Sequence, residues 1–179
     1  MVTNFISSKA KIGKNVKIWH FTYIGDNTEI GDNVKIGSLV HIDYDVKIGE
    51  NSMIEGSVYI PPLSRIGKKV FIGPAASLTN DPYPPSGKMI GVIIEDGAII
   101  GSRAVIKAGV TVGKNSVVTM GAVVTKNVPP YSLWIGNPAR QSGWMSEYGH
   151  RLKFDPDGQA VCPESKEKYI LKNGSVNKI

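Results

Sequence analysis

Side chains that could take part in chemistry are concentrated in one short segment of this 179-residue sequence. Asn80, Asp81 and Tyr83 place an amide, a carboxylate and a phenol close together, next to Pro82 and the Pro84-Pro85 pair. An amide can orient a polar substrate by hydrogen bonds, and a carboxylate can accept a proton or bind an amine. The segment contains no histidine. A reaction at this place would therefore proceed without an imidazole base from the segment itself.

The remaining candidates are scattered along the chain. The three histidines are His20, His41 and His150, and the single cysteine is Cys162. We interpret each histidine as a surface or subunit-interface residue and Cys162 as a packing residue of the tail. One cysteine can form no internal disulfide, and it has no cysteine neighbour at metal-ligand spacing, which fits a reducing compartment.

A six-residue repeat must position these side chains. Aliphatic residues recur every sixth position from Ile6 to Leu78 and again from Ile94 to Val124, in nineteen hexads. A small or β-branched residue follows nearly every aliphatic residue four positions later. Gly or Asn often stands between these two positions, and both residue types tolerate the positive φ of a corner. A period of six excludes an α-helical stripe at 3.6 and favours short strands. We therefore predict strands that stack coil upon coil in a parallel β-helix.

The repeat slips once and then ends. Between Leu78 and Ile94 the spacing is sixteen residues instead of six, so the chain leaves the coil as a loop over about 79–91. Loops on a rigid scaffold are frequent places for function. We predict a β-helix over residues 1–130 with the loop at 79–93, and a C-terminal cap and tail over 131–179. In the tail, 144–152 is expected to be a short helix, and the pairs Asp157-Gly158 and Asn173-Gly174 are expected to be hairpin turns.

The composition of the chain indicates which kinds of partner it lacks and in which cellular compartment it works. The net charge is +6 and the pI about 9.3, but the basic residues are dispersed instead of clustered with aromatics, so we expect no nucleic-acid partner. No apolar run is long enough to span a membrane, and the amino terminus does not read as a signal peptide. These features predict a cytoplasmic protein without a membrane partner.

The repeat resembles the pattern [LIV]-[GAED]-x-x-[STAV]-x of the hexapeptide-repeat acyltransferases over residues 6–129. That resemblance implies an all-β, three-sided left-handed coil, assembly as a homotrimer, and a loop that packs against the neighbouring subunit. The exit from Val128 to Arg140, with Gly136 and Pro138-Ala139-Arg140, is similar to acyl-CoA-dependent members of the family. It implies acetyl-CoA as co-substrate, without a metal. The implied contacts to coenzyme A are Gly101, Ala104, Ala122, Lys126 and Arg140.

Two segments, 73–80 and 138–149, resemble the N-acetyltransferases that act on UDP-2-acetamido-3-amino-2,3-dideoxy-D-glucuronate. This resemblance implies acetyl transfer to an amino group of a nucleotide-linked amino sugar, for surface polysaccharide synthesis. Asn80 is implied as the catalytic residue that orients the acceptor, with Asp81, Tyr83 and His41 as substrate-binding residues. The arginine that often follows Tyr-Pro in those enzymes is replaced here by Pro85, which leaves the identity of the sugar open.

Three alternatives remain at this point. A sugar O-acetyltransferase would use His41 or His20 as a base, because a hydroxyl needs proton removal before it attacks a thioester. A γ-class carbonic anhydrase would need three histidines on zinc, whereas His20 and His41 are 21 residues apart and out of register. The third alternative is a non-catalytic β-helix protein.

Overall fold

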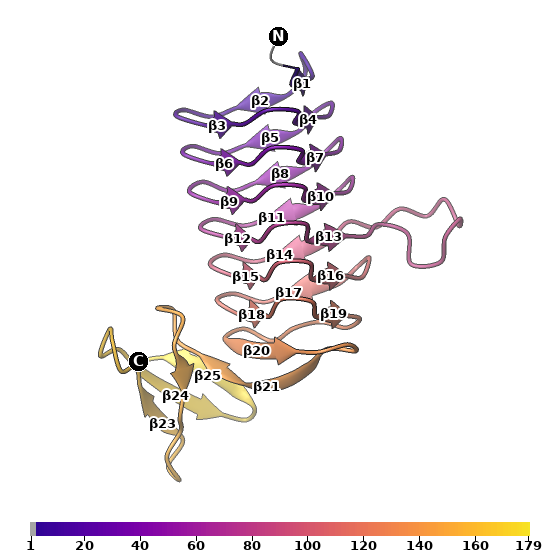
Figure 1. The fold of residues 1–179 in the computed structure, drawn as a ribbon. Coiled ribbons are helices and arrows are strands. Elements are labelled where there is room, and N and C mark those ends of the chain that lie inside the picture. Colours follow the sequence, from indigo (N-terminus) through magenta and orange to yellow (C-terminus); the bar gives the residue numbers. More distant parts are fainter. Residues whose placement is uncertain (1–2) are drawn as a thin grey trace.

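The chain winds into a prism with three faces, each built of stacked strands of two residues (Figure 1). This computed structural model describes residues 3–179, and residues 1 and 2, where the predicted coil begins, lie outside the described residues. The β1 face contains β1 (Phe5–Ile6), β4 (Tyr23–Ile24), β7 (His41–Ile42), β10 (Tyr59–Ile60), β13 (Ser77–Leu78), β16 (Val105–Ile106) and β19 (Val123–Val124). The β2 face contains β2 (Lys11–Ile12), β5 (Glu29–Ile30), β8 (Lys47–Ile48), β11 (Arg65–Ile66), β14 (Ile93–Ile94) and β17 (Thr111–Val112). The β3 face begins with β3 (Lys17–Ile18), β6 (Lys35–Ile36), β9 (Met53–Ile54), β12 (Phe71–Ile72), β15 (Ile99–Ile100) and β18 (Val117–Val118).

Each hexad of the sequence forms one of these strands, which confirms the predicted repeat. Residues 18 apart pair in parallel, for example Ile24 with Ile42 and Ile42 with Ile60. Across the loop the partners are 28 apart, as in Ile66 and Ile94. The aliphatic residue of each strand points inward, and along most of the coil it is at most 3% exposed. The core is therefore a narrow column of Ile, Val and Ala along the axis.

The corners between faces require a left-handed backbone. Asn15, Asn33 and Asn51 take φ of 55–61° at the corner between the β2 and β3 faces, where asparagine is well tolerated. The corner between the β3 and β1 faces places Phe21 and Leu39 in the same conformation, with φ of 60° and 62°. Both are 61% exposed. Bulky apolar residues are thus held at strained, exposed positions of that corner.

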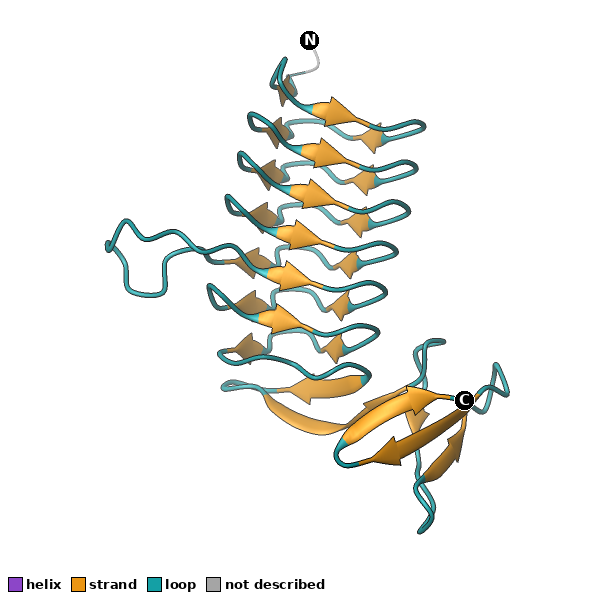
Figure 2. Ribbon diagram, turned by 180° about the vertical axis from the view of Figure 1, so that it is seen from behind, coloured by secondary structure: helices purple, strands orange, loops and turns teal. Residues whose placement is uncertain are grey.

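The coil is left-handed, as the family resemblance implied. In Figure 2 the near strands run from left to right while the chain descends from the N terminus, and the far strands return behind them. Parallel crossovers are usually right-handed.

The three faces differ in their outward side chains. On the β2 face Glu29 forms ion pairs with Lys11 and Lys47, each at 3.3 Å, and Arg65 continues the charged column. The β3 face changes from Lys17 and Lys35 to Met53, Phe71, Ile99 and Val117. The β1 face carries Phe5, Tyr23, His41 and Tyr59 before Ser77, Val105 and Val123. The β2 face is therefore charged along its first four strands, and the other two faces are largely apolar or aromatic.

The C-terminal end of the prism is closed by two longer strands. β20 (Ser132–Ile135) pairs in parallel with β18, and β21 (Arg140–Met145) returns antiparallel to β20. Trp134 is only 4% exposed and covers the end of the core. The predicted helix over 144–152 is wrong. Trp144 pairs with Leu152 and Met145 with Arg151 of β22 (Arg151–Leu152), so strand pairing replaces helical bonds there.

The tail ends in a separate three-stranded antiparallel sheet beside the closed end (Figure 1). Its strands are β23 (Gln159–Val161), β24 (Lys168–Lys172) and β25 (Ser175–Lys178). The predicted hairpin turn at Asn173-Gly174 joins β24 to β25 and is confirmed. The hairpin predicted at Asp157-Gly158 is wrong, because the turn there lies between β22 and β23, which belong to different sheets. Within residues 3–179 no helix is long and apolar enough to cross a membrane.

Candidate functional site

The single long loop leaves the prism between β13 and β14 and projects away from it (Figure 1). Its base is closed by the Ile90 N–H, which donates to the Asn80 carbonyl at 2.6 Å. Beside it, the Thr79 hydroxyl accepts the Ala108 N–H at 2.8 Å. Asn80 is half-buried at this root, and within residues 3–179 its side-chain amide has no hydrogen-bond partner. The amide is thus held in place by its backbone and is free to bind a ligand.

Asp81 shapes the loop. Its carboxylate accepts the N–H groups of Tyr83 at 2.9 Å, Ser86 at 2.8 Å and Gly87 at 3.2 Å, and the Ser86 hydroxyl at 2.6 Å. The hydrogen bond from the Ser86 side chain holds the pKa of Asp81 below its usual value, so the carboxylate stays charged. Both carboxylate oxygens of Asp81 thus accept hydrogen bonds from the loop itself. A substrate bound by Asp81 would have to share these oxygens with the loop.

Tyr83 belongs to the loop itself, whereas His41 belongs to the coil. Tyr83 is 77% exposed on the outgoing part of the loop, with the Lys107 ammonium 5.8 Å from its ring centre. His41 lies on the β1 face, two strands before β13, from which the loop departs. The structure therefore groups Asn80, Asp81 and Tyr83, and it places His41 about 10 Å further along the same face, from the usual spacing of neighbouring strands.

An aromatic column surrounds His41, which the sequence reasoning did not identify. The His41 ring stacks on Tyr23 at 4.4 Å with an interplanar angle of 14°, and it contacts Tyr59 at 5.5 Å and 49°. Phe5 stacks on Tyr23 at 4.8 Å. The signal was present in the sequence, because positions 5, 23, 41 and 59 are 18 residues apart, the length of one coil.

Two of the residues expected to contact coenzyme A belong to the inner layer of the coil, and a third, Gly101, lies half-buried at a corner. Ala104 and Ala122 are fully buried and point into the core, and their N–H groups donate to Gly101 and Thr119. At Gly101 an added Cβ would lie 2.3 Å from the backbone nitrogen of Met120 in the next coil. The structure thus gives these residues a packing function, and a ligand could reach only the surface above them.

Lys126 and Arg140 lie at the closed C-terminal end, as expected. The Lys126 ammonium is 5.9 Å from the ring centre of Trp134, and the Arg140 guanidinium donates to the Ala139 carbonyl at 2.9 Å. Both residues are exposed. They supply the positive charge at this end that a phosphorylated ligand would need.

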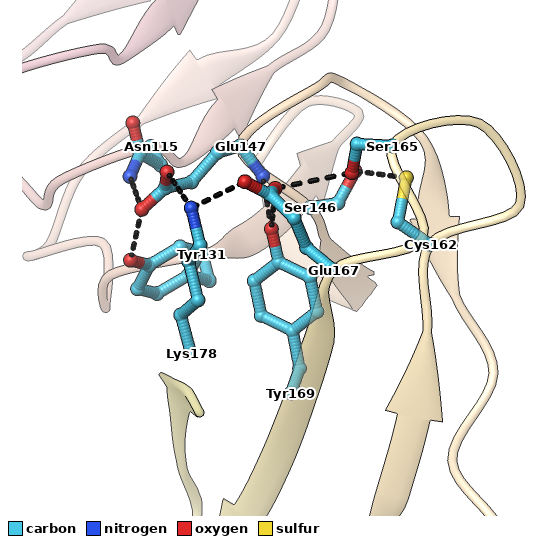
Figure 3. A network of polar contacts seen from close by, with 9 residues as sticks. All are labelled: Asn115, Tyr131, Ser146, Glu147, Cys162, Ser165, Glu167, Tyr169 and Lys178. Carbon is cyan, nitrogen blue, oxygen red and sulfur yellow. Dashed lines mark hydrogen bonds and ion pairs between the residues drawn. The ribbon is translucent and has the colours of Figure 1, made fainter.

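A polar network joins the tail to the coil, and Glu147 is its centre (Figure 3). The Glu147 carboxylate accepts the Tyr131 hydroxyl at 2.8 Å, the Asn115 amide at 3.3 Å and the Lys178 ammonium at 3.0 Å. Burial works to raise the pKa of Glu147, but the hydrogen bonds from Lys178 and Tyr131 outweigh it and keep this pKa below its usual value. Lys178 also pairs with Glu167.

Cys162 lies beside this network and is completely buried (Figure 3). Burial acts to raise the thiol pKa, yet hydrogen bonds with Ser146, at 3.3 Å, and with Ser165 lower the pKa to about 7. The packing function expected for Cys162 agrees with its burial. Within residues 3–179 no group of three or more His, Cys, Asp and Glu side chains is arranged to hold a metal ion.

Two surface hollows lie away from the loop. One of about 600 Å³ is lined by Lys68, Lys69, Asp96, Lys114 and Glu147, and one of about 400 Å³ is lined by Trp19, Lys35, Met53 and Glu55. Both adjoin the β3 face. The loop lies at the opposite edge of the β1 face, so a single subunit does not combine these hollows with Asn80.

Comparison with known families matches the coil on both sides of the loop. Residues 9–43 and 27–62 match the bacterial transferase hexapeptide (six repeats), and residues 91–126 match the hexapeptide repeat of succinyl-transferase. The first two ranges lie within the first run of hexads, and the third covers the second run, after the loop.

Individual relatives agree with this match. The chain is 39% identical over 87 residues to a dTDP-3-amino-3,6-dideoxy-α-D-galactopyranose 3-N-acetyltransferase from Aneurinibacillus thermoaerophilus. The match covers 49% of this chain and 44% of that protein, so the chain spans less than half the length of this relative. A hexapeptide-repeat acetyltransferase from Vibrio cholerae has a TM-score of 0.55 and 25% identity, covering 75% of this chain and 73% of its own. A UDP-N-acetylglucosamine acyltransferase from Campylobacter jejuni shares the fold, with a TM-score of 0.54 and 17% identity over 79% of this chain and 73% of its own.

Proposed function

Because this chain belongs to the bacterial hexapeptide-repeat transferases, we propose that it is an acetyl-CoA-dependent N-acetyltransferase. Its acceptor is the amino group of a nucleotide-linked amino sugar. One observation carries the acceptor class, namely the 39% identity to an enzyme that acetylates such an amino group. The proposed setting is the synthesis of surface polysaccharide in the cytoplasm, where acetyl-CoA is available.

The architecture of the loop supports an amine as acceptor. A neutral amine is nucleophilic without help, so the protein must mainly orient it toward the thioester. The amine nitrogen attacks the thioester carbonyl, the C–S bond breaks, and the departing thiolate takes a proton from the nitrogen. We propose that the free amide of Asn80 orients the acceptor at the root of the loop. Tyr83, exposed beside Lys107, extends the acceptor surface.

Coenzyme A is proposed to run along the coil toward the closed end. Lys126 and Arg140 there are exposed cations, and a guanidinium binds phosphate oxygens in pairs. The flat wall above Gly101, Ala104 and Ala122 offers space for the thin pantetheine arm, since their side chains do not project outward. We propose that residues 1–130 form the catalytic coil and residues 131–179 its cap.

We further propose a homotrimer, and the faces of the prism support it. Phe21, Leu39 and Trp19 are exposed at the corner between the β3 and β1 faces, at 61%, 61% and 44%. The two adjoining faces are largely apolar or aromatic, whereas the first four strands of the β2 face carry charged side chains. With that corner on a threefold axis, the β1 face of one subunit would meet the β3 face of the next, and the β2 face would remain in water. The loop would then lie at the outer edge of each cleft between subunits.

A substrate panel tests the proposed activity. Purified protein is incubated with acetyl-CoA and either UDP- or dTDP-linked amino sugars, and thiol release is followed. Acetylation of amino but not of hydroxyl acceptors is the expected result, and a preference for hydroxyl acceptors would support the sugar O-acetyltransferase alternative. No thiol release with any amino sugar would refute the proposed function.

Substitution at the root of the loop tests the proposed role of Asn80. The variant Asn80→Ala should lower kcat/KM for the amino sugar about ten-fold or more, the scale of one lost positioning hydrogen bond. Asn177→Ala, on the exposed surface of β25, is the matched control and should leave kcat/KM unchanged. Equal kinetics of the two variants would remove Asn80 from the site.

A further inference from the structure

The corner of the coil that follows β16 holds both ends of the loop. The Ala108 N–H donates to the Thr79 hydroxyl at 2.8 Å, where the loop begins. The Gly109 N–H donates to the Gly91 carbonyl at 3.3 Å, where the loop ends. Residues 107–109 therefore form the base on which the loop stands.

Lys107 is the first residue of this corner, and its side chain is directed toward the loop. Its N–H donates to the Val124 carbonyl of the next coil at 2.9 Å, which fixes its backbone. Because β16 pairs with β13, Lys107 lies beside Thr79 in the coil next to the one that Asn80 leaves. Neighbouring coils are about 4.8 Å apart. The Lys107 ammonium is exposed and lies 5.8 Å from the centre of the Tyr83 ring.

The charge of Lys107 is not neutralised by the protein. Within residues 3–179 its ammonium forms no ion pair with a carboxylate. The carboxylate of the loop, Asp81, directs both oxygens to N–H groups and a hydroxyl of the loop itself. A free positive charge thus stands beside the free amide of Asn80. An exposed charge of this kind attracts anionic ligands.

The next cation along the same side of the coil points elsewhere. Lys126 follows β19, and its ammonium lies 5.9 Å from the centre of the Trp134 ring at the closed end. Lys107 is directed toward the loop and Lys126 toward the closed end. The proposed acceptor also has an anionic part, because the diphosphate of its nucleotide is joined directly to the sugar. Its amino group and its diphosphate are separated only by the sugar ring.

We propose that Lys107 binds a phosphate oxygen of the nucleotide that carries the amino sugar, while Asn80 orients the amino group. This inference rests on the proposed function and names the part of the acceptor that the coil recognises. The ammonium donates charge-assisted hydrogen bonds to the phosphate. The Tyr83 ring keeps the ammonium on the loop side of the corner through a cation–π contact. Lys107 thereby selects nucleotide-linked sugars over free sugars.

Removal of this charge should weaken binding of the acceptor and leave the chemical step alone. We expect Lys107→Met to raise KM for a nucleotide-linked amino sugar about ten-fold or more, the scale of one lost hydrogen bond between charged groups. The kcat should be unchanged, because the contact is the same before and during the reaction. KM for acetyl-CoA should also be unchanged. Lys107→Arg keeps the charge and should restore most of the affinity.

The test compares kcat and KM of wild type and variants with a nucleotide-linked amino sugar and with the same amino sugar without the nucleotide. Lys172→Met changes an exposed lysine of β24 and is the matched control, with kinetics like wild type. Calorimetric binding of UDP and dTDP gives a second measurement that needs no turnover, and Lys107→Met should weaken it by a similar factor. Unfolding midpoints verify that the variants are folded.

Three results would overturn the inference. A higher KM for acetyl-CoA alone would assign Lys107 to the phosphates of coenzyme A. An equal loss with both amino sugars would show that Lys107 only supports the loop. Unchanged binding of UDP and dTDP in Lys107→Met would exclude the phosphate contact. Failure of wild type to acetylate any amino sugar would instead refute the proposed function.

Discussion

The glycine at position 101 offers a direct test of what the coil requires at its corners. Gly101 begins the corner after β15, and its N–H donates to Val118 of the next coil at 2.7 Å. A Cβ at this position would lie 2.3 Å from the Met120 nitrogen and 2.6 Å from the Thr119 carbonyl carbon. Because both are backbone atoms, no side-chain rotation can relieve the contact. We expect Gly101→Ala to force the two coils apart.

The magnitude can be derived from the same distances. An ordinary contact needs at least 3.4 Å, so the neighbouring backbone must move by about 1 Å against the ladder of coil-to-coil hydrogen bonds. Overpacking of this kind costs about 1–3 kcal/mol. Restriction of the unfolded chain by alanine offsets about 0.4–1 kcal/mol of that. We therefore expect a net loss of about 1–2 kcal/mol in the free energy of unfolding.

Urea unfolding of Gly101→Ala and of Gly56→Ala measures this difference. Gly56 is the matched control, since its added Cβ would meet only the Ser38 carbonyl oxygen, at 3.2 Å, and we expect a change below about 0.5 kcal/mol. Acetyl-CoA binding by calorimetry separates packing from ligand contact. If Gly101→Ala is as stable as Gly56→Ala and yet binds acetyl-CoA much more weakly, Gly101 acts on the ligand and the packing argument fails.

Two further predictions concern the tail and the proposed trimer. Glu147→Gln removes the charge that binds Lys178, so amide hydrogen exchange in β24 and β25 should accelerate while β7 to β13 keep wild-type rates. The pKa values of Glu147 and Glu167 are lowered in the folded protein. The stability that these two carboxylates contribute is therefore fully present above about pH 4.3 and is lost as the pH falls through their folded pKa values. If the protection of the tail amides, relative to the unfolded chain at the same pH, stays constant down to about pH 3, this prediction is wrong. Leu39→Asn relieves a bulky residue at a φ of 62°, so the isolated subunit should gain about 1 kcal/mol. The same change should weaken subunit association in sedimentation equilibrium, and unchanged association would refute the proposed interface.

The repeat shows how far local information reaches in this protein. Inward aliphatic residues, corner glycines and asparagines, and the slip between Leu78 and Ile94 are all local signals, and each hexad became one strand of the coil. The position of the loop, with Asn80 at its root, follows from counting the period. These features are predictable because each coil repeats the same short-range geometry and stacks in only one register.

Other features were decided by contacts between distant segments. The 144–152 segment was expected to be a helix, but Trp144 pairs with Ser132 and Leu152, and these strand partners determine its conformation. The burial of Ala104 and Ala122, in contrast, follows from the repeat, because each stands four positions after an inward aliphatic residue.

The surroundings of His41 were also determined partly by the sequence and partly by the tertiary structure. The sequence by itself determined that the loop has no histidine and that His41, Tyr23 and Tyr59 share one phase of an 18-residue coil. Only the tertiary structure decided that Asp43 lies 3.9 Å from the imidazole and that Tyr44 contacts Met89 of the loop. The physical reason is that stacking determines which residues are neighbours along a face. The orientation of a side chain at a corner depends on the coils above and below it.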